Sequence, residues 1–205
     1  MAFSHHTIYL ASASPRRREL LKQIGVRFEV LLPRAHSART DVDEMPQPGE
    51  NPSDYVLRLA RAKADMGSMS IRTRYLPAYP VLAADTTVSL DGDIIGKPAD
   101  RAEAAFTLAR LAGRSHEVLT AVAIAFDNEV EVMLSRSSVK FAPLTAQAIR
   151  RYVASGESHD KAGAYAIQGR AAVFIDRLDG SYSGVMGLPM YETAQLLQRF
   201  GIEVL

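Results

Sequence analysis

Two serines and three arginines lie close together in the segment Ser12-Ala-Ser-Pro-Arg-Arg-Arg18. The apolar run Thr7–Leu10 precedes it, and apolar residues at helical spacing follow it up to Gly25, which predicts a strand, a tight loop and a helix. Ser14 suits the N-cap and Pro15 the first helical position. Arginines in a first turn oppose the helix dipole. They either gather a phosphate-type anion together with the serine hydroxyls and free N–H groups, or form a solvated face.

A carboxylate interrupts the apolar stretch Val81–Leu90 at Asp85. Burying a carboxylate is costly unless it is paired, hydrogen-bonded or bound to a metal, so Asp85 is the best catalytic candidate; a structural aspartate is the alternative. Asp91-Gly92 is a hairpin turn signal. The returning strand over 94–98 is therefore expected to bring Lys97 close to Asp85, as an acid–base pair or a metal-plus-phosphate pair.

Further acidic and basic candidates flank the next predicted helix. The loop Arg34–Asn51 contains Asp41-Val-Asp-Glu44, three acids that could hold a hard divalent cation or simply be solvated. Apolar spacing predicts a helix over 52–64, with Lys63 at the edge of its buried face, where a snorkelling lysine is the alternative. Residues 65–80 are expected to connect this helix to the next strand.

Two glycine-containing stretches near the C-terminus could approach a ligand. In Asp160–Gly169, the Gln168 amide could read a base edge, with an ordinary turn as the alternative. Gly180–Pro189 reads as a loop and lacks the order of a P-loop. His116, at the start of a strand, is either a polar cap or a ligand. The other expected elements are strands over 27–32, 116–126 and 129–141 and helices over 102–112, 144–154 and 190–200. Asp100 is expected to cap the helix over 102–112.

Composition narrows the class of protein. A chain of 205 residues fits one compact domain over 1–205. The formal net charge of +1 argues against a general nucleic-acid binder. With no cysteine there is no disulfide framework and no thiolate chemistry, which fits a reducing cytoplasm. No apolar run approaches the roughly 20 residues of a membrane span, and residues 1–6 lack a signal pattern. We therefore expect a cytoplasmic protein without membrane contact.

Taken together, these segments resemble the Maf family of nucleoside triphosphate pyrophosphatases, formerly called septum formation proteins. The matching motifs keep their order over nearly the whole chain. They are Ser12-Ala-Ser-Pro-Arg-Arg17, Asp43-Glu44, Arg58-Leu-Ala with Lys63-Ala, Ala84-Asp-Thr-Thr-Val88, Gly96-Lys-Pro98, His116-Glu-Val-Leu-Thr120, Asp160-Lys-Ala-Gly-Ala-Tyr165 with Gln168-Gly169, and Gly187-Leu-Pro189.

The resemblance implies an α/β fold of the Maf/ITPase-like kind, with a central twisted mixed β-sheet flanked by helices and two lobes with a cleft. It implies hydrolysis between the α and β phosphates with Mg²⁺ or Mn²⁺, commonly by a homodimer. Residues 160–168 and 180–187 look like the dTTP/UTP branch. The alternatives are a purine or 7-methyl-GTP pyrophosphatase of the sister branch and a non-catalytic nucleotide-binding regulator of septum formation. The chain departs from the family mainly between 32 and 44, where its loop is longer.

Residue roles follow from the chemistry and the resemblance together. Asp85 and Glu44 are expected to bind the metal or orient the attacking water. Lys63 and Lys97, with the arginines, are expected to clamp the triphosphate. Thr86 and Gln168 resemble residues that read the pyrimidine. The predicted catalytic residues are Asp85, Glu44, Lys97 and Lys63, the metal ligands are Asp85 and Glu44, and the substrate-binding residues are Ser12, Ser14, Arg16, Arg17, Thr86 and Gln168.

Overall fold

A computed structural model describes residues 7–32 and 42–204 of the protein. Seven strands form one mixed sheet. They are β1 (Thr7–Leu10), β2 (Arg27–Val30), β3 (Val81–Leu90), β4 (Asp93–Ile95), β5 (Ser115–Phe126), β6 (Glu129–Phe141) and β7 (Ile175–Asp179). The strand order is β2-β1-β3-β5-β6-β7, with β4 paired to β3. The pairs of β1 with β2 and β3 are parallel, and all other pairs are antiparallel.

Helices flank this sheet along the chain. They are α1 (Pro15–Gln23), α2 (Pro52–Arg74), α3 (Arg101–Leu111), α4 (Ala146–Ala154), α5 (Tyr182–Met186) and α6 (Met190–Arg199), with short 3₁₀ turns η1 (Ala162–Ala164) and η2 (Arg170–Phe174). The predicted caps are confirmed. Ser14 Oγ accepts from the Arg17 N–H at the start of α1, and Asp100 Oδ1 accepts from the Glu103 N–H at 2.8 Å in α3.

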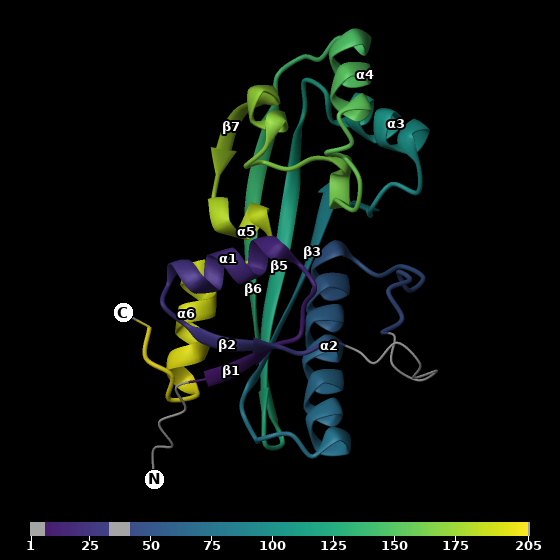
Figure 1. Ribbon diagram of the computed structural model, residues 1–205. Coiled ribbons are helices and arrows are strands. Elements are labelled where there is room, and N and C mark those ends of the chain that lie inside the picture. The colour runs from purple at the N-terminus through teal and green to yellow at the C-terminus, as the bar shows by residue number, and fades with distance from the viewer. Residues whose placement is uncertain (1–6, 33–41, 205) are drawn as a thin grey trace.

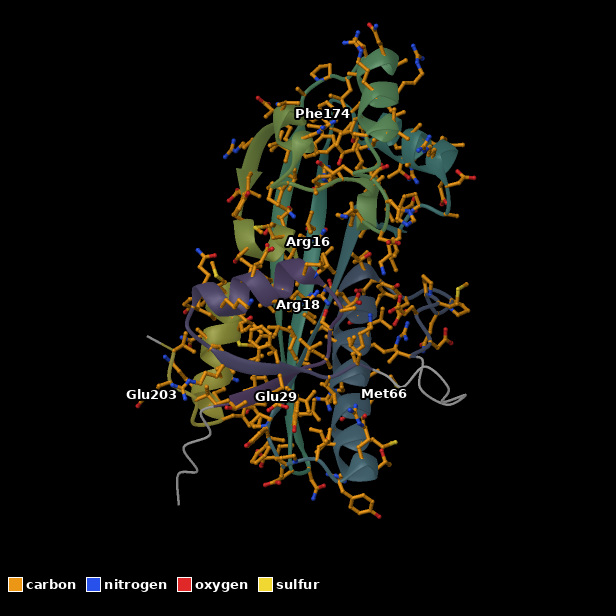
Figure 2. The ribbon with its side chains drawn as sticks, in the orientation of Figure 1. Arg16, Arg18, Glu29, Met66, Phe174 and Glu203 are labelled. Carbon is orange, nitrogen blue, oxygen red and sulfur yellow. The ribbon has the colours of Figure 1, made fainter. Side chains whose placement is uncertain are left out.

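Three hydrophobic clusters divide the molecule into two lobes. In the larger lobe, α2 covers one face of the sheet through Leu59 and Ala64, whereas α1 and α6 pack on the other face through Leu21 and Leu196 (Figure 1). A third cluster, which contains Phe174, holds α3 and α4 to the far ends of the long strands. In Figure 2, Phe174 lies in this smaller lobe and Arg16 lies on α1, near the border between the lobes. The predicted fold class is thereby confirmed.

The edge of β3 is interrupted where the lobes meet. The pairing of β3 with β1 ends at Leu82, and its pairing with β4 begins at Val88. Within the described chain, residues 83–87 therefore have a strand partner, β5, on one side only. Because side chains alternate along a strand, the side chains of Asp85 and Thr86, both at this open edge, point to opposite faces of the sheet.

The structure corrects three predicted boundaries. Helix α2 continues to Arg74, ten residues past its predicted end at Ala64, so most of the predicted connection over 65–80 is helical. Gly67 lies inside α2, where a Cβ would come within 2.5 Å of Val81 Cγ1. The absence of a side chain therefore lets the helix pack closely on β3. The predicted loop over 180–189 contains the short helix α5. Strand β2 ends at Val30, short of the predicted Leu32.

Candidate active site

A cavity of about 680 Å³ lies between the two lobes, beside the open edge of β3. This is within the usual size range of small-molecule sites. Lining residues come from the β1–α1 loop, from α2 and β3, and from the segments around Lys97, Lys161 and Gly187. Nine of the ten predicted site residues line it, and these are Ser12, Ser14, Arg16, Arg17, Glu44, Lys63, Asp85, Thr86 and Lys97.

Two carboxylates converge on one ammonium group on the α2 side of β3. Lys63 Nζ lies 2.5 Å from Glu44 Oε1 and 2.6 Å from Asp85 Oδ1. The Asp85 side chain is only 12% exposed, whereas that of Glu44 is 52% exposed and borders the cavity. Burial alone would raise the pKa of Glu44, but its hydrogen bond to Lys63 and the nearby cations hold that pKa below its usual value. This group is called the carboxylate side below.

The carboxylate side fits a divalent cation. Glu44 and Asp85 already share one cation, the Lys63 ammonium, and carboxylate oxygens are the ligands that Mg²⁺ and Mn²⁺ prefer. Mg²⁺ is commonly held by one or two carboxylates together with substrate phosphates. Among the residues that the structure describes, no group of three or more metal-ligating side chains gathers. The phosphates of a substrate would therefore have to complete the coordination.

On the other face of β3, Arg17 joins three elements through its guanidinium. Its Nε donates to the Gly187 carbonyl at 2.7 Å, its Nη1 to Ser12 Oγ at 3.2 Å, and its Nη2 to Thr86 Oγ1 at 3.4 Å. Burial lowers the pKa of Arg17, and Asp85 acts in the opposite direction. Two of the five guanidinium N–H groups make none of these bonds, and Arg17 lines the cavity. The residues Ser12, Arg17, Thr86, Thr120 and Gly184 are called the hydroxyl side below.

Two further cations border the cavity. Arg16 Nε donates to the Met186 carbonyl at 3.2 Å, while Lys161 lines the cavity from the smaller lobe. Burial and the charge of Arg16 lower the pKa of Lys161. Lys161 belongs to a quoted motif, but the sequence analysis gave it no role because a lysine in a loop has no periodicity to orient it. Arg18 is turned to the Ala13 carbonyl and does not line the cavity.

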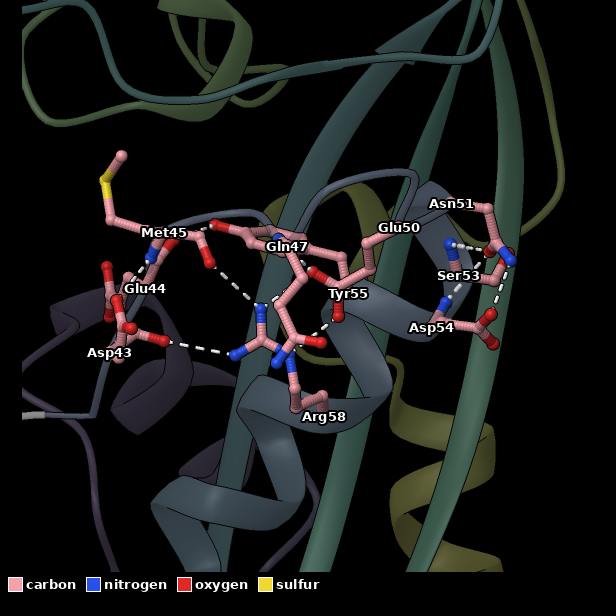
Figure 3. Close-up of polar contacts among 10 residues, drawn as sticks. All are labelled: Asp43, Glu44, Met45, Gln47, Glu50, Asn51, Ser53, Asp54, Tyr55 and Arg58. Carbon is pink, nitrogen blue, oxygen red and sulfur yellow. Dashed lines mark hydrogen bonds and ion pairs between the residues drawn. The ribbon is translucent and has the colours of Figure 1, made fainter.

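Arg58 holds the loop that carries Glu44 (Figure 3). Its guanidinium pairs with both Glu50 carboxylate oxygens, at 2.6 and 2.8 Å, and donates to the carbonyls of Asp43 and Met45. Tyr55 Oη donates to the Glu44 carbonyl at 2.9 Å. The hydrogen bonds that Glu50 accepts from Arg58, together with the one from the Gln47 N–H, lower its pKa to about 2. Two residues of α2 thus fix the backbone on both sides of Glu44, a role that the sequence pattern did not indicate.

Two expectations about the site differ from the structure. The ionic partner of Asp85 is Lys63 and not Lys97, because β4 ends at Ile95 before it reaches the level of Asp85. Gln168 is exposed and does not line the cavity, and its role in reading the base stays a prediction. Asp43 Oδ1 accepts from the Met45 N–H and does not join Glu44 at Lys63. Asp41, the other acid of the predicted metal cluster, lies outside the described residues, as do residues 1–6.

His116 is buried, as expected for a polar cap. It is 3% exposed, and its Nε2 lies 2.9 Å from Tyr165 Oη, while Tyr165 itself lines the cavity. Nδ1 has no hydrogen-bond partner among the described residues. Burial lowers the pKa of His116 to about 4, so the imidazole is neutral near pH 7.

Comparisons with known proteins bear on this site. The model of the family described as Maf-like protein matches residues 7–200. A dTTP/UTP pyrophosphatase of Nitrosomonas europaea is 54% identical over 198 residues, covering 96% of each chain. Another from Nitrosospira multiformis is 55% identical over 205 residues, which cover 100% of this chain and 99% of that one. A solved structure of the Staphylococcus aureus Ham1 protein is 18% identical and covers 66% of this chain and 72% of its own, with a TM-score of 0.46. The family match spans almost every residue of the site, and the chain belongs to the Maf-like protein family.

Proposed function

We propose that the protein hydrolyses dTTP and UTP to the nucleoside monophosphate and pyrophosphate. The observation that carries this proposal is one cavity that combines two carboxylates, Glu44 and Asp85, with a set of cations that can bind a triphosphate. Relatives at 54–55% identity over nearly their full length bear the name dTTP/UTP pyrophosphatase. The cations are Arg16, Arg17, Lys63, Lys97 and Lys161.

The proposed chemistry is a direct attack of water on the phosphoanhydride. Such a reaction requires an oriented water and neutralisation of charge on the phosphate oxygens, and it needs no covalent nucleophile. Asp85, largely buried, orients the water and accepts its proton, while Lys63 and Lys97 offset charge on the leaving pyrophosphate. Ser12 and the free N–H groups at the start of α1 cradle another phosphate.

Glu44 and Asp85 are the residues that would hold a Mg²⁺ or Mn²⁺ ion. A divalent cation at this place would neutralise phosphate oxygens and help to order the triphosphate. Lys63 Nζ lies between the same two carboxylates, so it maintains their positions as a monovalent counter-ion. We propose that Thr86, at the open edge of β3, and Gln168 read the pyrimidine.

We also propose the cellular compartment, the class of ligand and the oligomeric state. No cysteine occurs among the 205 residues, which suits a cytoplasmic enzyme, and a net charge of +1 favours a nucleotide substrate over nucleic acid. In the described parts of the chain, no helix has both the length and the apolar character that crossing a membrane requires. A homodimer is proposed from the family resemblance.

A substrate panel tests the proposed function. Pyrophosphate release by the purified protein is measured with dTTP, UTP, CTP, ITP and 7-methyl-GTP, with Mg²⁺ or Mn²⁺ and with a chelator. We expect dTTP and UTP to give the highest kcat/KM and the chelator to stop turnover. A preference for ITP or 7-methyl-GTP would replace the pyrimidine assignment, and no release from any nucleotide would contradict an enzymatic function.

A further inference from the structure

Thr120 of β5 is a buried residue next to the cavity that has no assigned role. It pairs directly with Thr86 across the two strands. Its side chain is 1% exposed, so it touches no substrate. Its Oγ1 lies 3.0 Å from Thr86 Oγ1 and 2.8 Å from the carbonyl oxygen of Gly184 in α5. The three oxygens therefore form a short chain from the interior to the cavity wall.

Proton counting fixes the direction of this chain. A threonine hydroxyl has one proton, and a carbonyl oxygen can only accept. If Thr120 donated to Thr86, its oxygen would face the Gly184 oxygen at 2.8 Å with no proton between them. Two oxygen atoms in such contact repel each other, and a buried acceptor without a hydrogen bond is costly. Thr120 therefore donates to Gly184, and Thr86 donates to Thr120.

The direction of these hydrogen bonds determines what Thr86 can offer to a ligand in the cavity. Its only proton points inward to Thr120, and Arg17 Nη2 donates to its oxygen at 3.4 Å. What Thr86 Oγ1 offers to a ligand is a lone pair, next to the unused N–H groups of Arg17. This edge presents an acceptor beside a donor, and it cannot switch to two donors while Thr120 holds the Thr86 proton.

We propose that Thr120 is a positioning residue for base selection, because it makes Thr86 a hydrogen-bond acceptor only. This inference rests on the proposed hydrolysis of dTTP and UTP. Uracil and thymine carry a proton on ring nitrogen 3, which Thr86 accepts, with the neighbouring carbonyl facing Arg17. Cytosine has a lone pair on that nitrogen, which opposes the lone pair of Thr86. One hydroxyl chain thus favours uracil and thymine together over cytosine.

The test compares kcat and KM for UTP and CTP in three variants. Thr120→Val is nearly isosteric and removes the hydroxyl, Thr120→Ser keeps it, and Ser135→Ala removes a buried hydroxyl opposite Thr120 on β6 as a matched control. We expect Thr120→Val to lower the UTP-to-CTP ratio of kcat/KM about tenfold or more, mainly through KM, because Thr86 can then donate to the cavity. Thr120→Ser and Ser135→Ala should keep the wild-type ratio. If Thr120→Val does not fold, as judged by its thermal unfolding, Thr120→Ala replaces it.

The outcomes separate this inference from the proposed function. A wild-type enzyme that favours UTP over CTP, with the same ratio in the folded hydroxyl-free variant, would overturn the role of Thr120 and leave the enzyme assignment in place. A fall in the ratio that Thr120→Ser does not rescue would also overturn it. Wild-type protein that hydrolyses no pyrimidine nucleotide would remove the proposed function and this inference together.

Discussion

Asp85 and Thr86 are neighbours in the sequence, yet they belong to two different sets of contacts. Asp85 faces α2 and shares the Lys63 ammonium with Glu44, whereas Thr86 faces α1 and α5 and bonds to Thr120 and Arg17. Strand alternation at the open edge of β3 makes this separation possible. Thr86, which is proposed to read the base, is thereby separated from the two carboxylates, whereas Ser12 and Arg17 on the hydroxyl side are also proposed to bind phosphate.

The two sides also differ in how they are held in place. On the carboxylate side, Glu44 comes from a loop that is held by the part-buried bonds of Arg58, from α2, with Glu50. The hydroxyl side is anchored within the sheet and in the β1–α1 turn, by short bonds among buried or partly buried groups. Variants of the carboxylate side should therefore change the rate for every nucleotide, and variants of Thr86 or Thr120 on the hydroxyl side should change the preference among them.

Asp85→Asn should have the largest effect. Replacing the carboxylate by an amide keeps the shape but removes the charge and the proton acceptor, so we expect kcat to fall by about a thousandfold for UTP and CTP alike. Steady-state pyrophosphate release measures this, and Asp93→Asn, a surface aspartate paired with Arg110, is the matched control. A folded Asp85→Asn variant with nearly wild-type kcat would remove Asp85 from the mechanism.

Lowering the pH should reduce the free energy of unfolding through His116, which lies on the same face of β5 as Thr120. Burial lowers its pKa to about 4, against 6.5 in the unfolded chain. Between these values the unfolded state binds more protons, so the free energy of unfolding falls by about 3 kcal/mol as the pH drops from 6.5 to 4. The hydrogen bond from Lys63 and the nearby cations hold the pKa of Glu44 below its usual value, so the charge of Glu44 is favoured in the folded protein.

Urea unfolding at pH 7 and pH 4 measures this loss in the wild type and in His116→Gln. The glutamine keeps a polar group near Tyr165 but does not titrate, so the variant should lose about 3 kcal/mol less than the wild type over the same interval. Equal losses in both proteins would show that His116 is not the group responsible.

Arg58→Lys should have a smaller effect on the carboxylate side. A lysine cannot reproduce the forked contact with Glu50 and with two loop carbonyls, so Glu44 is held less firmly. We expect kcat to fall about tenfold, equally for UTP and CTP. Arg61→Lys, one turn along α2 and bonded to the Val130 carbonyl, is the control. A change in the UTP-to-CTP ratio with constant kcat would break the proposed division between the two sides.

Gln168→Ala should give the smallest change. Because Gln168 lies outside the cavity, we expect the UTP-to-CTP ratio of kcat/KM to fall only about threefold, with kcat nearly unchanged. Competition assays with mixed UTP and CTP resolve such a difference. An unchanged ratio would leave Thr86 and Arg17 as the proposed base-reading groups without Gln168.

Local patterns in the sequence predicted most of the elements. The caps at Ser14 and Asp100 and the hairpin at Asp91-Gly92 depend on residues within a few positions, so composition and spacing indicate them. Gly67 falls in the stretch that was predicted to connect helix and strand. Glycine weakens an isolated helix, but the close packing of α2 on Val81 outweighs that cost.

The contacts of the site were less predictable, because they join distant segments. Lys63 was placed at a helix edge, but its two carboxylate partners come from another loop and another strand. The anchoring by Arg58 and the proton direction set by Thr120 need distances, which spacing cannot supply. Gln168 lies outside the cavity lining although its motif suggested a role there, because a motif names a residue without saying which way its turn faces.

The most direct test of the account identifies the products formed from UTP. Hydrolysis with Mg²⁺ is followed by quantitative chromatography of the nucleotides together with separate assays for pyrophosphate and inorganic phosphate. We expect equal amounts of UMP and pyrophosphate, no UDP, and no reaction above background with Asp85→Asn. UDP and inorganic phosphate as the first products would contradict cleavage between the α and β phosphates.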